Sequence, residues 1–388
     1  MPPRAALAAL LVGLTAAAGC SGAETFAQHP GFDAWFAAHP PDPAPASPVE
    51  RELLRRYRPL LHVPATAAGP LDFYRDYIAH GRLHADGRTW SRVDRAAAGG
   101  ARGRPGAVFV HEPPPGADAR AVAYGRVEHA RLAPFGRLTF LEWHFVFRVS
   151  GLPAALPAWQ EWLAGLAGDP HDWHQLDHYT AATLVLGPAP GHVPLGLVLQ
   201  QHNAQRAYWF GRDLPRPPNG RVRLAAALRS NELYPWRGQQ ARHRAVRFLE
   251  PGNAAWLTTG HGERPWDGSH DVTVPGRRVD YALRFLAGTD PFYRFSGRLG
   301  ADRWLPGRDG PPGADYDAIP AFQARPLQLC AFRWPRRHDD DRLAALEALL
   351  AAPGDAGARA TLMEDCRRFV AKSIGYNSAA TSHRTARR

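Results

Sequence analysis

The segment GRLTFLEWHFVFRV, residues 136–149, constrains the fold more than any other part of this chain. Large apolar side chains occupy every second position of it, namely Leu141, Trp143, Phe145, Phe147 and Val149. A repeat of two residues is the period of an extended strand, whose side chains alternate between its two faces. The opposite face carries Leu138, Phe140, Glu142, His144, Val146 and Arg148. The pattern therefore predicts one long strand.

The chain around this segment is also rich in strand patterns separated by turn residues. Strands are predicted at 59–63, 107–112, 120–129, 179–187, 194–202, 205–210, 220–227, 244–249 and 278–286. Helices are predicted from the capping box Ser47-Pro48-Val49-Glu50 to about Tyr57, and at 71–81, 153–167, 339–354 and about 358–373. This order favours antiparallel strands over βαβ units. We expect a mainly β fold, an antiparallel, jelly-roll-like β-sandwich with helical excursions and a C-terminal helical segment.

The composition is that of a folded protein and argues against nucleic acid as a partner. The 388 residues are 45% hydrophobic, which suffices for the core of one large domain or two modest ones. The formal net charge is +11, but the basic residues are almost all arginines scattered among acidic residues, with Lys372 as the single lysine. A groove that follows a nucleic-acid backbone needs basic residues interleaved with aromatic ones. We expect no nucleic-acid partner.

The N-terminus resembles a bacterial lipoprotein signal. Arg4 is followed by an apolar stretch from Ala5 to Ala18 that is too short to span a membrane, and then by AAGCSG. The resemblance implies that Cys20 is fatty-acylated, for example with palmitate, and becomes the mature N-terminus in the cell envelope, facing the periplasm or the exterior. Position −3 is Ala17, where the family usually has leucine. An ordinary secretory signal cut after Ala18 is the alternative.

These features divide the chain into five parts, with the sandwich in the middle. We expect a signal peptide at 1–19, a lipid-anchored segment with a proline-rich linker at 20–48, a β-sandwich domain at 49–290, a C-terminal loop and helical extension at 291–375, and a disordered basic tail at 376–388. If Cys20 is acylated, Cys330 and Cys366 remain as an even pair. In an oxidising compartment such a pair suggests a disulfide, with two unrelated buried thiols as the alternative.

The stretch GDPHDWHQLDHYTAATLVLG, residues 168–187, concentrates histidines and aspartates before an apolar run. On an extended chain Asp172, His174 and His178 point to one face, and imidazole and carboxylate groups together can bind a divalent metal. His171 in the preceding turn and His202 at the end of the next predicted strand can add ligands. Glu142 and His144 are a possible second source. The alternative is a hydrogen-bonded polar strand entry, since the spacing matches no known metal motif.

The order of several short motifs resembles the vacuolar-protein-sorting sixty-two-like family of β-sandwich proteins, which is distantly similar to necrosis-inducing cytolysin domains. The motifs are YRPLLHV (57–63), LEWHFVF (141–147), HDWHQLDHYTAATLVLG (171–187), PLGLVLQQHN (194–203) and VRLAAALRSNELYPW (222–236). The resemblance spans roughly residues 52–290. It implies a β-sandwich and a site around the Asp-Trp turn.

Carried over residue by residue, the resemblance points to His171, Asp172 and either His174 or Asp177 as ligands of a divalent metal. The family's acid after Asp-Trp is His174 here, and a second register aligns the motif with Asp177-His178-Tyr179 instead. The second register brings the motif nearer to His202. The family's Ser-His pair reads Ser230-Asn231, so the carboxylate contribution and the choice of register stay open.

Three functions are compatible with these observations. The first is an envelope lipoprotein whose β-sandwich binds a ligand or a divalent metal, with no activity assigned. The second is a metal-dependent hydrolase of an envelope substrate, in which a metal activates water and an aspartate acts as base. The third is a surface interaction module whose aromatic and arginine residues, for example in AYWFGRD (207–213), meet a glycan or a protein.

Overall fold

A computed structural model describes residues 44–85, 87–91, 108–111, 120–132, 136–201, 204–211, 213–244, 270–295 and 298–300. Several of the residues singled out above lie outside these ranges: Cys20, His202, Cys330, Cys366 and the two predicted C-terminal helices. The lipid attachment and the disulfide therefore stay predictions. Most of the predicted strand at 244–249 also lies outside the described residues.

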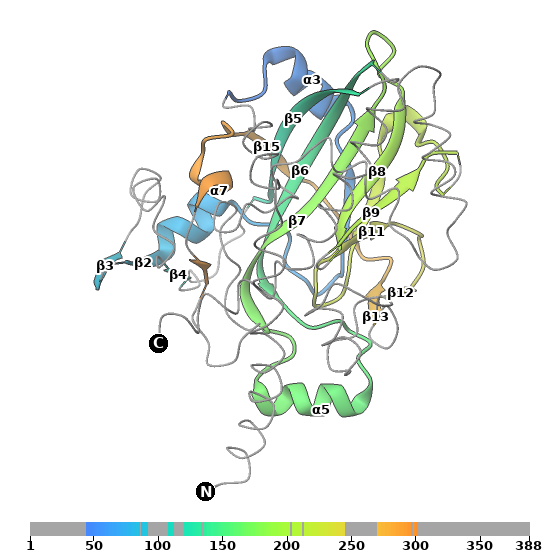
Figure 1. Ribbon diagram of the computed structural model, residues 1–388. Coiled ribbons are helices and arrows are strands. Elements are labelled where there is room, and N and C mark those ends of the chain that lie inside the picture. The colour runs from blue at the N-terminus through green and yellow to red at the C-terminus, as the bar shows by residue number, and fades with distance from the viewer. Residues whose placement is uncertain are drawn as a thin grey trace, which may run out of the picture.

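A six-stranded sheet forms the centre of the molecule (Figure 1). Its order is β15 (Ala282–Phe285), β5 (Val122–Leu132), β6 (Gly136–Ser150), β7 (His174–Leu186), β8 (Pro194–Gln201) and β9 (Ala204–Trp209). Strands β5 to β9 follow one another as an antiparallel meander, and β15 joins β5 in parallel. The aromatic segment of the sequence is β6, as its alternation predicts.

A four-stranded sheet packs on the inner face of this meander. Its order is β11 (Leu233–Pro235), β10 (Arg223–Ala226), β1 (Leu60–Val63) and β14 (Arg277–Val279). Trp143 and Phe145 of β6 lie in one buried cluster with Leu61 of β1 and Leu224 of β10. Helix α3 (Pro48–Arg56) begins at the predicted capping box around Ser47 and adds Leu54 to this core. The mainly β, sandwich-type fold is confirmed.

A third layer covers the outer face of the six-stranded sheet. It consists of a π-turn, η1 (Phe73–Tyr77), a 3-10 turn, η2 (Ile78–His80), helix α7 (Pro291–Arg294) and a small sheet. The small sheet has the order β16 (Arg298–Leu299), β4 (Val108–His111), β2 (Gly81–Ala85) and β3 (Arg88–Ser91). Phe73, Val146 and Phe292 belong to the second buried cluster, between this layer and the sheet. Strand β6 is therefore buried on both faces.

Smaller elements complete the described part of the chain. Helix α5 (Ala158–Ala167) lies at one end of the molecule, between β6 and β7 in sequence (Figure 1). A 3-10 turn, η3 (Pro218–Gly220), precedes β10. Strands β12 (Ala241–Arg244) and β13 (His270–Thr273) form an antiparallel pair beside β11.

Three details differ from the sequence expectation. The predicted strand at 278–286 is two strands, because β14 joins the four-stranded sheet and β15 joins β5. The predicted helix at 71–81 is a π-turn followed by a 3-10 turn. Antiparallel pairing dominates, yet β1 with β10, β15 with β5 and β16 with β4 are parallel pairs. Each of these pairings joins segments that are distant in sequence, where local patterns give no information.

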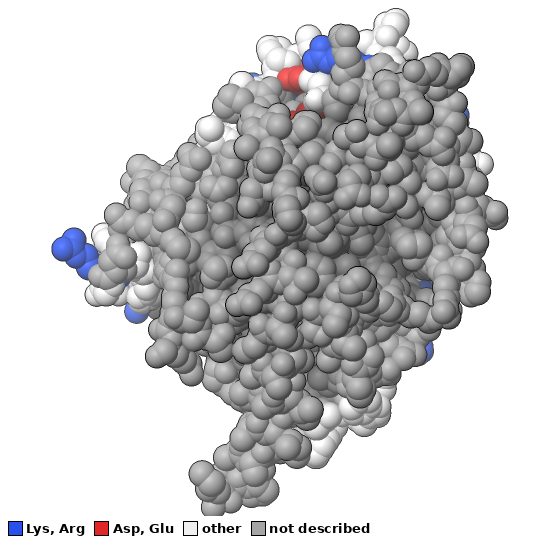
Figure 2. Space-filling model, viewed as in Figure 1, with Lys and Arg blue, Asp and Glu red and all other residues white. Residues whose placement is uncertain are grey.

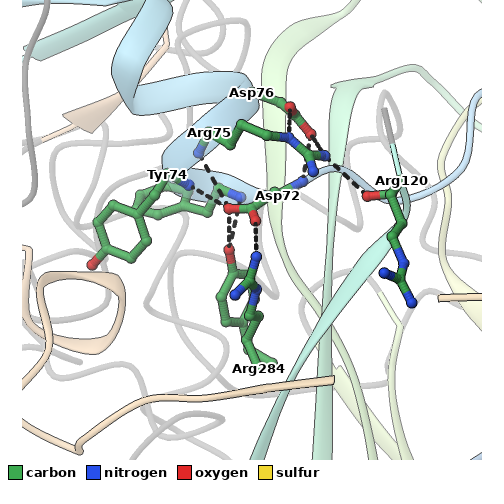
Figure 3. Close-up of polar contacts among 8 residues, drawn as sticks. Asp72, Tyr74, Arg75, Asp76, Arg120 and Arg284 are labelled. Atoms are coloured by element: carbon green, nitrogen blue, oxygen red, sulfur yellow. Dashed lines mark hydrogen bonds and ion pairs between the residues drawn. The ribbon is translucent and has the colours of Figure 1, made fainter. Parts of the chain in front are cut away.

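A buried aspartate holds the third layer to the sheet (Figure 3). Asp72 caps η1 by accepting hydrogen bonds from the backbone N–H groups of Tyr74 and Arg75, at 3.1 and 3.2 Å. The Tyr124 hydroxyl on β5 donates to the same carboxylate at 3.0 Å, and Arg284 on β15 lies 3.5 Å from it. Burial, followed by the charge and hydrogen bond of Asp72, raises the pKa of Tyr124 well above its usual value. The Tyr124 proton therefore stays available for this bond.

Replacing Gly276 by alanine should destabilise the four-stranded sheet. Gly276 has a φ of +61° in the turn before β14, and a Cβ there would lie 2.3 Å from the carbonyl oxygen of Val63 on β1. The clash and the left-handed backbone together should lower the free energy of unfolding by about 2–3 kcal/mol. Urea denaturation followed by circular dichroism measures it.

The matched control is Gly87→Ala in the turn between β2 and β3. Gly87 also has a positive φ, +71°, but a Cβ there meets nothing within 4 Å. This variant should lose only the backbone preference, about 1 kcal/mol. Equal losses for the two variants would show that the approach of Gly276 to Val63 does not constrain the sheet.

Candidate functional site

The predicted metal-ligand residues are spread over a turn and the start of β7. His171 is exposed, and its backbone N–H donates to Asp169 Oδ1 at 2.8 Å. Strand β7 begins at His174, which is half-buried and has its ring Nδ1 3.2 Å from the Gln175 carbonyl oxygen. Asp172 therefore lies before the strand, in the turn, where the expected alternation of faces does not yet apply.

The alternation is also interrupted inside β7. Leu176 has a φ of +54°, and the pairing of β7 with β6 shifts register between Phe145 and Phe147. Asp177 is buried opposite Phe147, on the inner face, whereas Leu176 packs into the outer cluster. Within the described ranges, no three His, Cys, Asp or Glu side chains group together as metal ligands. The His178 side chain and His202 lie outside the description, so the proposed ligand set stays a prediction.

The possible second source of metal ligands, Glu142 and His144, lies on the opposite face of the six-stranded sheet from Asp177. Glu142 and His144 are fully buried on the outer face of β6, with His144 Nε2 3.2 Å from Glu142 Oε2. The Thr183 hydroxyl donates to Glu142 at 3.2 Å, and the Tyr293 ring of α7 meets the His144 ring edge to face. Since Asp177 occupies the inner face, β6 and β7 separate it from this pair. The two groups do not form one site.

The turn that carries Ser230 and Asn231 meets Asp177 directly. Asn231 Nδ2 donates to the Val149 carbonyl oxygen at 2.7 Å and to Asp177 Oδ2 at 3.3 Å. The adjacent Ser230 hydroxyl donates to Asp271 Oδ1 at 2.7 Å. Positive φ values at Arg229 (+68°) and Asn231 (+58°) let neighbouring side chains point to different strands. The strained turn therefore joins two buried carboxylates, Asp177 of β7 and Asp271 of β13.

Asp271 is itself the centre of a buried polar group on the outer side of the four-stranded sheet. The Tyr234 hydroxyl donates to Asp271 Oδ2 at 2.6 Å, and the Tyr234 ring stacks on His243 with centroids 3.9 Å apart. His243 Nε2 lies 2.8 Å from the Thr273 hydroxyl. In these contacts Ser230 donates to a carboxylate and has no imidazole to accept its proton, so they do not form the serine–histidine pair of a nucleophile.

The aromatic segment 207–213 points partly into the core. Tyr208 packs against the inner cluster, and Phe210 belongs to it. The Gln201 amide donates to the Tyr208 hydroxyl at 3.1 Å and to the Leu233 carbonyl oxygen at 2.6 Å. These two aromatic residues therefore serve the packing of the sandwich and are not a free surface for a partner.

One aromatic residue directly after β11 lies outside the buried core. Trp236, two residues after Tyr234, stacks on His62 of β1 with ring centroids 4.7 Å apart and planes inclined by 25°. The Arg223 guanidinium lies 5.1 Å from the Trp236 ring centroid. Arg278 of β14 is the register partner of His62. We call these four residues, His62, Arg223, Trp236 and Arg278, the His62–Trp236 platform.

The platform is positively charged and accessible. Arg223 and Arg278 are exposed, and within the described residues neither forms an ion pair with a carboxylate. Burial, followed by the charges of Arg223 and Arg278, holds the pKa of His62 below its usual value. Trp236 is fixed in place because its Nε1–H donates to the Pro275 carbonyl oxygen at 3.1 Å. The geometry suits a ligand that carries negative charge.

The platform was not predicted from the sequence. His62 and Arg223 stand as single polar residues inside apolar strands, in PLLHV and VRLAAA, which is the one local signal of an exposed face. Their meeting with Trp236 and Arg278 depends on β1 pairing with both β10 and β14. No pattern within a short window of sequence gives that pairing.

Comparisons with known proteins give only distant likenesses. No family model and no curated protein matches the chain. Necrosis and Ethylene inducing Protein 2 from the causal agent of cocoa's Witches Broom disease is 14% identical, covering 72% of this chain and 91% of its own, with a TM-score of 0.31. NLPPya in complex with glucosamine is 14% identical, covering 50% of this chain and 70% of its own, with a TM-score of 0.29. At these TM-scores the fold assignment rests on the sheets described above.

Stability at mildly acidic pH should depend on His62. Because the pKa of His62 is lowered in the folded protein from the usual 6.5, the unfolded chain takes up this proton first as pH falls. The contribution of His62 is therefore complete above about pH 6.5 and decreases below it. In urea titrations from pH 7.5 to 5, His62→Gln should show a flatter fall in unfolding free energy than the wild type. Parallel curves would contradict this.

Proposed function

We propose that this protein is an envelope lipoprotein whose β-sandwich binds an anionic ligand on the His62–Trp236 platform. The observation that carries the proposal is the pair of exposed arginines, Arg223 and Arg278, beside the stacked His62 and Trp236 rings. A guanidinium group forms two parallel hydrogen bonds with a carboxylate or phosphate, and an aromatic ring next to it offers an apolar surface. Binding, not catalysis, is the activity that these groups support.

The ligand class that fits is a saccharide carrying carboxylate or phosphate groups. The platform lies on one face of the four-stranded sheet, where the exposed Arg223 and Arg278 flank the half-buried His62 and Trp236. A charged and aromatic sheet surface suits an extended polymer better than a small molecule that must be enclosed. Acidic glycans of a cell envelope have this chemistry.

The envelope location rests on the sequence around Cys20. A short apolar stretch leads into Ala-Gly-Cys, and acylation of that cysteine anchors a protein at a membrane surface without a spanning segment. Among the residues that the structure describes, no helix is long and apolar enough to cross a bilayer. A Cys330–Cys366 disulfide would suit the oxidising side of that membrane.

Substituting either platform arginine should weaken binding of an acidic glycan. A charge-assisted hydrogen bond contributes about 1.5–3 kcal/mol, so Arg223→Gln and Arg278→Gln should each reduce affinity by about tenfold or more. Isothermal titration with oligogalacturonate and with a phosphorylated disaccharide gives the affinities and tells the two anionic groups apart. Affinity should rise once the pH falls below the lowered pKa of His62, because the protonated ring adds a third positive charge.

The matched control is Arg277→Gln, one residue from Arg278. Arg277 is also exposed, but it pairs with Val63 in the register and donates to the Ala67 carbonyl oxygen at 3.2 Å. This variant has the same net charge as Arg278→Gln and should bind nearly as the wild type does. If all three variants lose affinity equally, binding follows overall charge and the platform is not the site.

A divalent metal near Asp177 is the second candidate, favoured by the contact of Asp177 with the strained Asn231 turn. The described residues alone do not complete a zinc centre, which needs at least three protein ligands. Such a site would require His178 or His202, and a metal-dependent hydrolase would further require an open coordination position. No reaction step follows from the present geometry.

Metal content decides this second candidate. Elemental analysis of the purified protein should find about one divalent ion per chain, and Asp177→Asn and His202→Ala should each lose most of it. His80→Ala is the control, because His80 is an exposed histidine of η2 in the third layer, on the far side of the six-stranded sheet from Asp177. A wild-type protein without metal after metal-supplemented growth would leave the turn as a structural polar cluster.

A further inference from the structure

Helix α5 exposes large apolar side chains and buries a polar one, the reverse of the pattern in a helix that packs on a domain. Trp159 and Trp162 keep 51% and 62% of their surface exposed, whereas Gln160 is 2% exposed and Ala164 is 6% exposed. A surface helix of a globular protein normally buries its apolar stripe and exposes its polar one. In α5 the buried face holds a polar side chain and the exposed face holds two of the largest apolar ones.

The exposed face of α5 is continuous and uncharged. Positions 159, 162 and 166 lie on one side of the helix at the spacing of three and four residues, and Leu166 is half-buried there. Gly165 is exposed beside them, and a Cβ at Gly165 would meet nothing within 4 Å. Glu161, the single charged residue of α5, is bound to Arg229 at 2.7 Å. The outward face therefore presents indole and aliphatic groups only.

The position of α5 at one end of the molecule suits contact with a flat surface. The helix lies across one end of the molecule, and α3 lies at the other end (Figure 1). Basic and acidic side chains gather at the α3 end (Figure 2), where α3 carries Glu50, Glu52 and three arginines. Among the described residues, α3 thus carries several charged side chains, whereas α5 carries two exposed tryptophans.

We propose that α5 docks on the surface of a lipid bilayer, with Trp159 and Trp162 in the interfacial region. Indole rings prefer this region because their flat apolar body and their N–H group are both satisfied there. The exposed area is too small to hold a protein at a membrane alone, so the contact acts together with a second attachment. The inference therefore rests on the proposed acylation of Cys20.

The length of chain before the sandwich permits both attachments at once. Residues 21–43 separate Cys20 from the first described residue, and a chain of that length spans at most about 80 Å. The linker alone therefore does not fix how the domain faces the membrane. The α5 contact supplies that orientation, with the α5 end on the lipid and the α3 end away from it.

Brominated lipids test the contact, because bromine in the acyl chains quenches tryptophans that lie near them. The full acylated chain is reconstituted in vesicles of phosphatidylcholine, a neutral lipid that does not engage the platform by net charge. We expect Trp159→Phe/Trp162→Phe to remove more than half of the lipid-dependent quenching, although ten of the twelve tryptophans remain. Trp236→Phe should leave it unchanged. Equal quenching in the wild type and the double variant overturns the proposal.

A second measurement separates this contact from the anchor. The weak partitioning of the Cys20→Ser chain is titrated at high lipid concentration with the same vesicles, and Trp159→Ala/Trp162→Ala in that background should lower the partition coefficient at least threefold. Val49→Ala, which alters an exposed apolar residue of α3, should not change it. Failure of the anchor shows as absence of fatty-acid label in the wild type and leaves the quenching result readable. If the wild type is a dimer that the double alanine variant dissociates, and quenching is absent, a second copy covers α5 and the proposal is wrong.

Discussion

Burial of β6 on both faces is the constraint on which the rest of the structure depends. The four-stranded sheet covers Trp143 and Phe145 on one face, and η1 and α7 cover Val146 on the other. A strand with two covered faces must satisfy every polar side chain internally, because water does not reach it. Glu142 follows this rule, because its carboxylate lies beside His144 Nε2 and accepts a hydrogen bond from the Thr183 hydroxyl.

Period-two alternation was enough to find β6 and most strands of the meander, since each buries at least one face. It was not enough to split 278–286 between two sheets, because both halves carry the same local pattern and differ only in distant partners. In residues 168–187, which carry the predicted metal ligands, the alternation of side chains between two faces breaks at Leu176. The left-handed backbone of this residue changes the direction of the strand. The family resemblance pointed to the motifs that contain Asp177 and Asn231, and these two side chains do make contact. The His62–Trp236 platform stayed hidden because His62 and Arg278 come from segments far from the β10–β11 hairpin that carries Arg223 and Trp236.

The two polar regions of the sandwich differ in what they can offer a partner. Asp177, Asn231 and Asp271 are held by hydrogen bonds inside the protein, and the strain at Arg229 and Asn231 is balanced by those bonds. The platform differs from this group, because its stacked rings lie beside two arginines whose side chains are exposed. The Trp236 ring is already held by its bond to Pro275, so it would lose little conformational entropy in the binding that we propose for the platform.

The partners of β1 come late in the sequence, and this has a consequence for how the chain folds while it is being made. The Tyr281 hydroxyl donates to the Pro59 carbonyl oxygen across 222 residues of chain, and Arg221 Nε donates to Arg58 across 163. Contacts over such separations form slowly, because a long loop must close before any of them is gained. During synthesis the early strand therefore waits, unpaired, until nearly the whole sandwich has been made. Until then the apolar side chain of Leu61, which is fully buried in the finished core, has no partner from the second sheet to cover it.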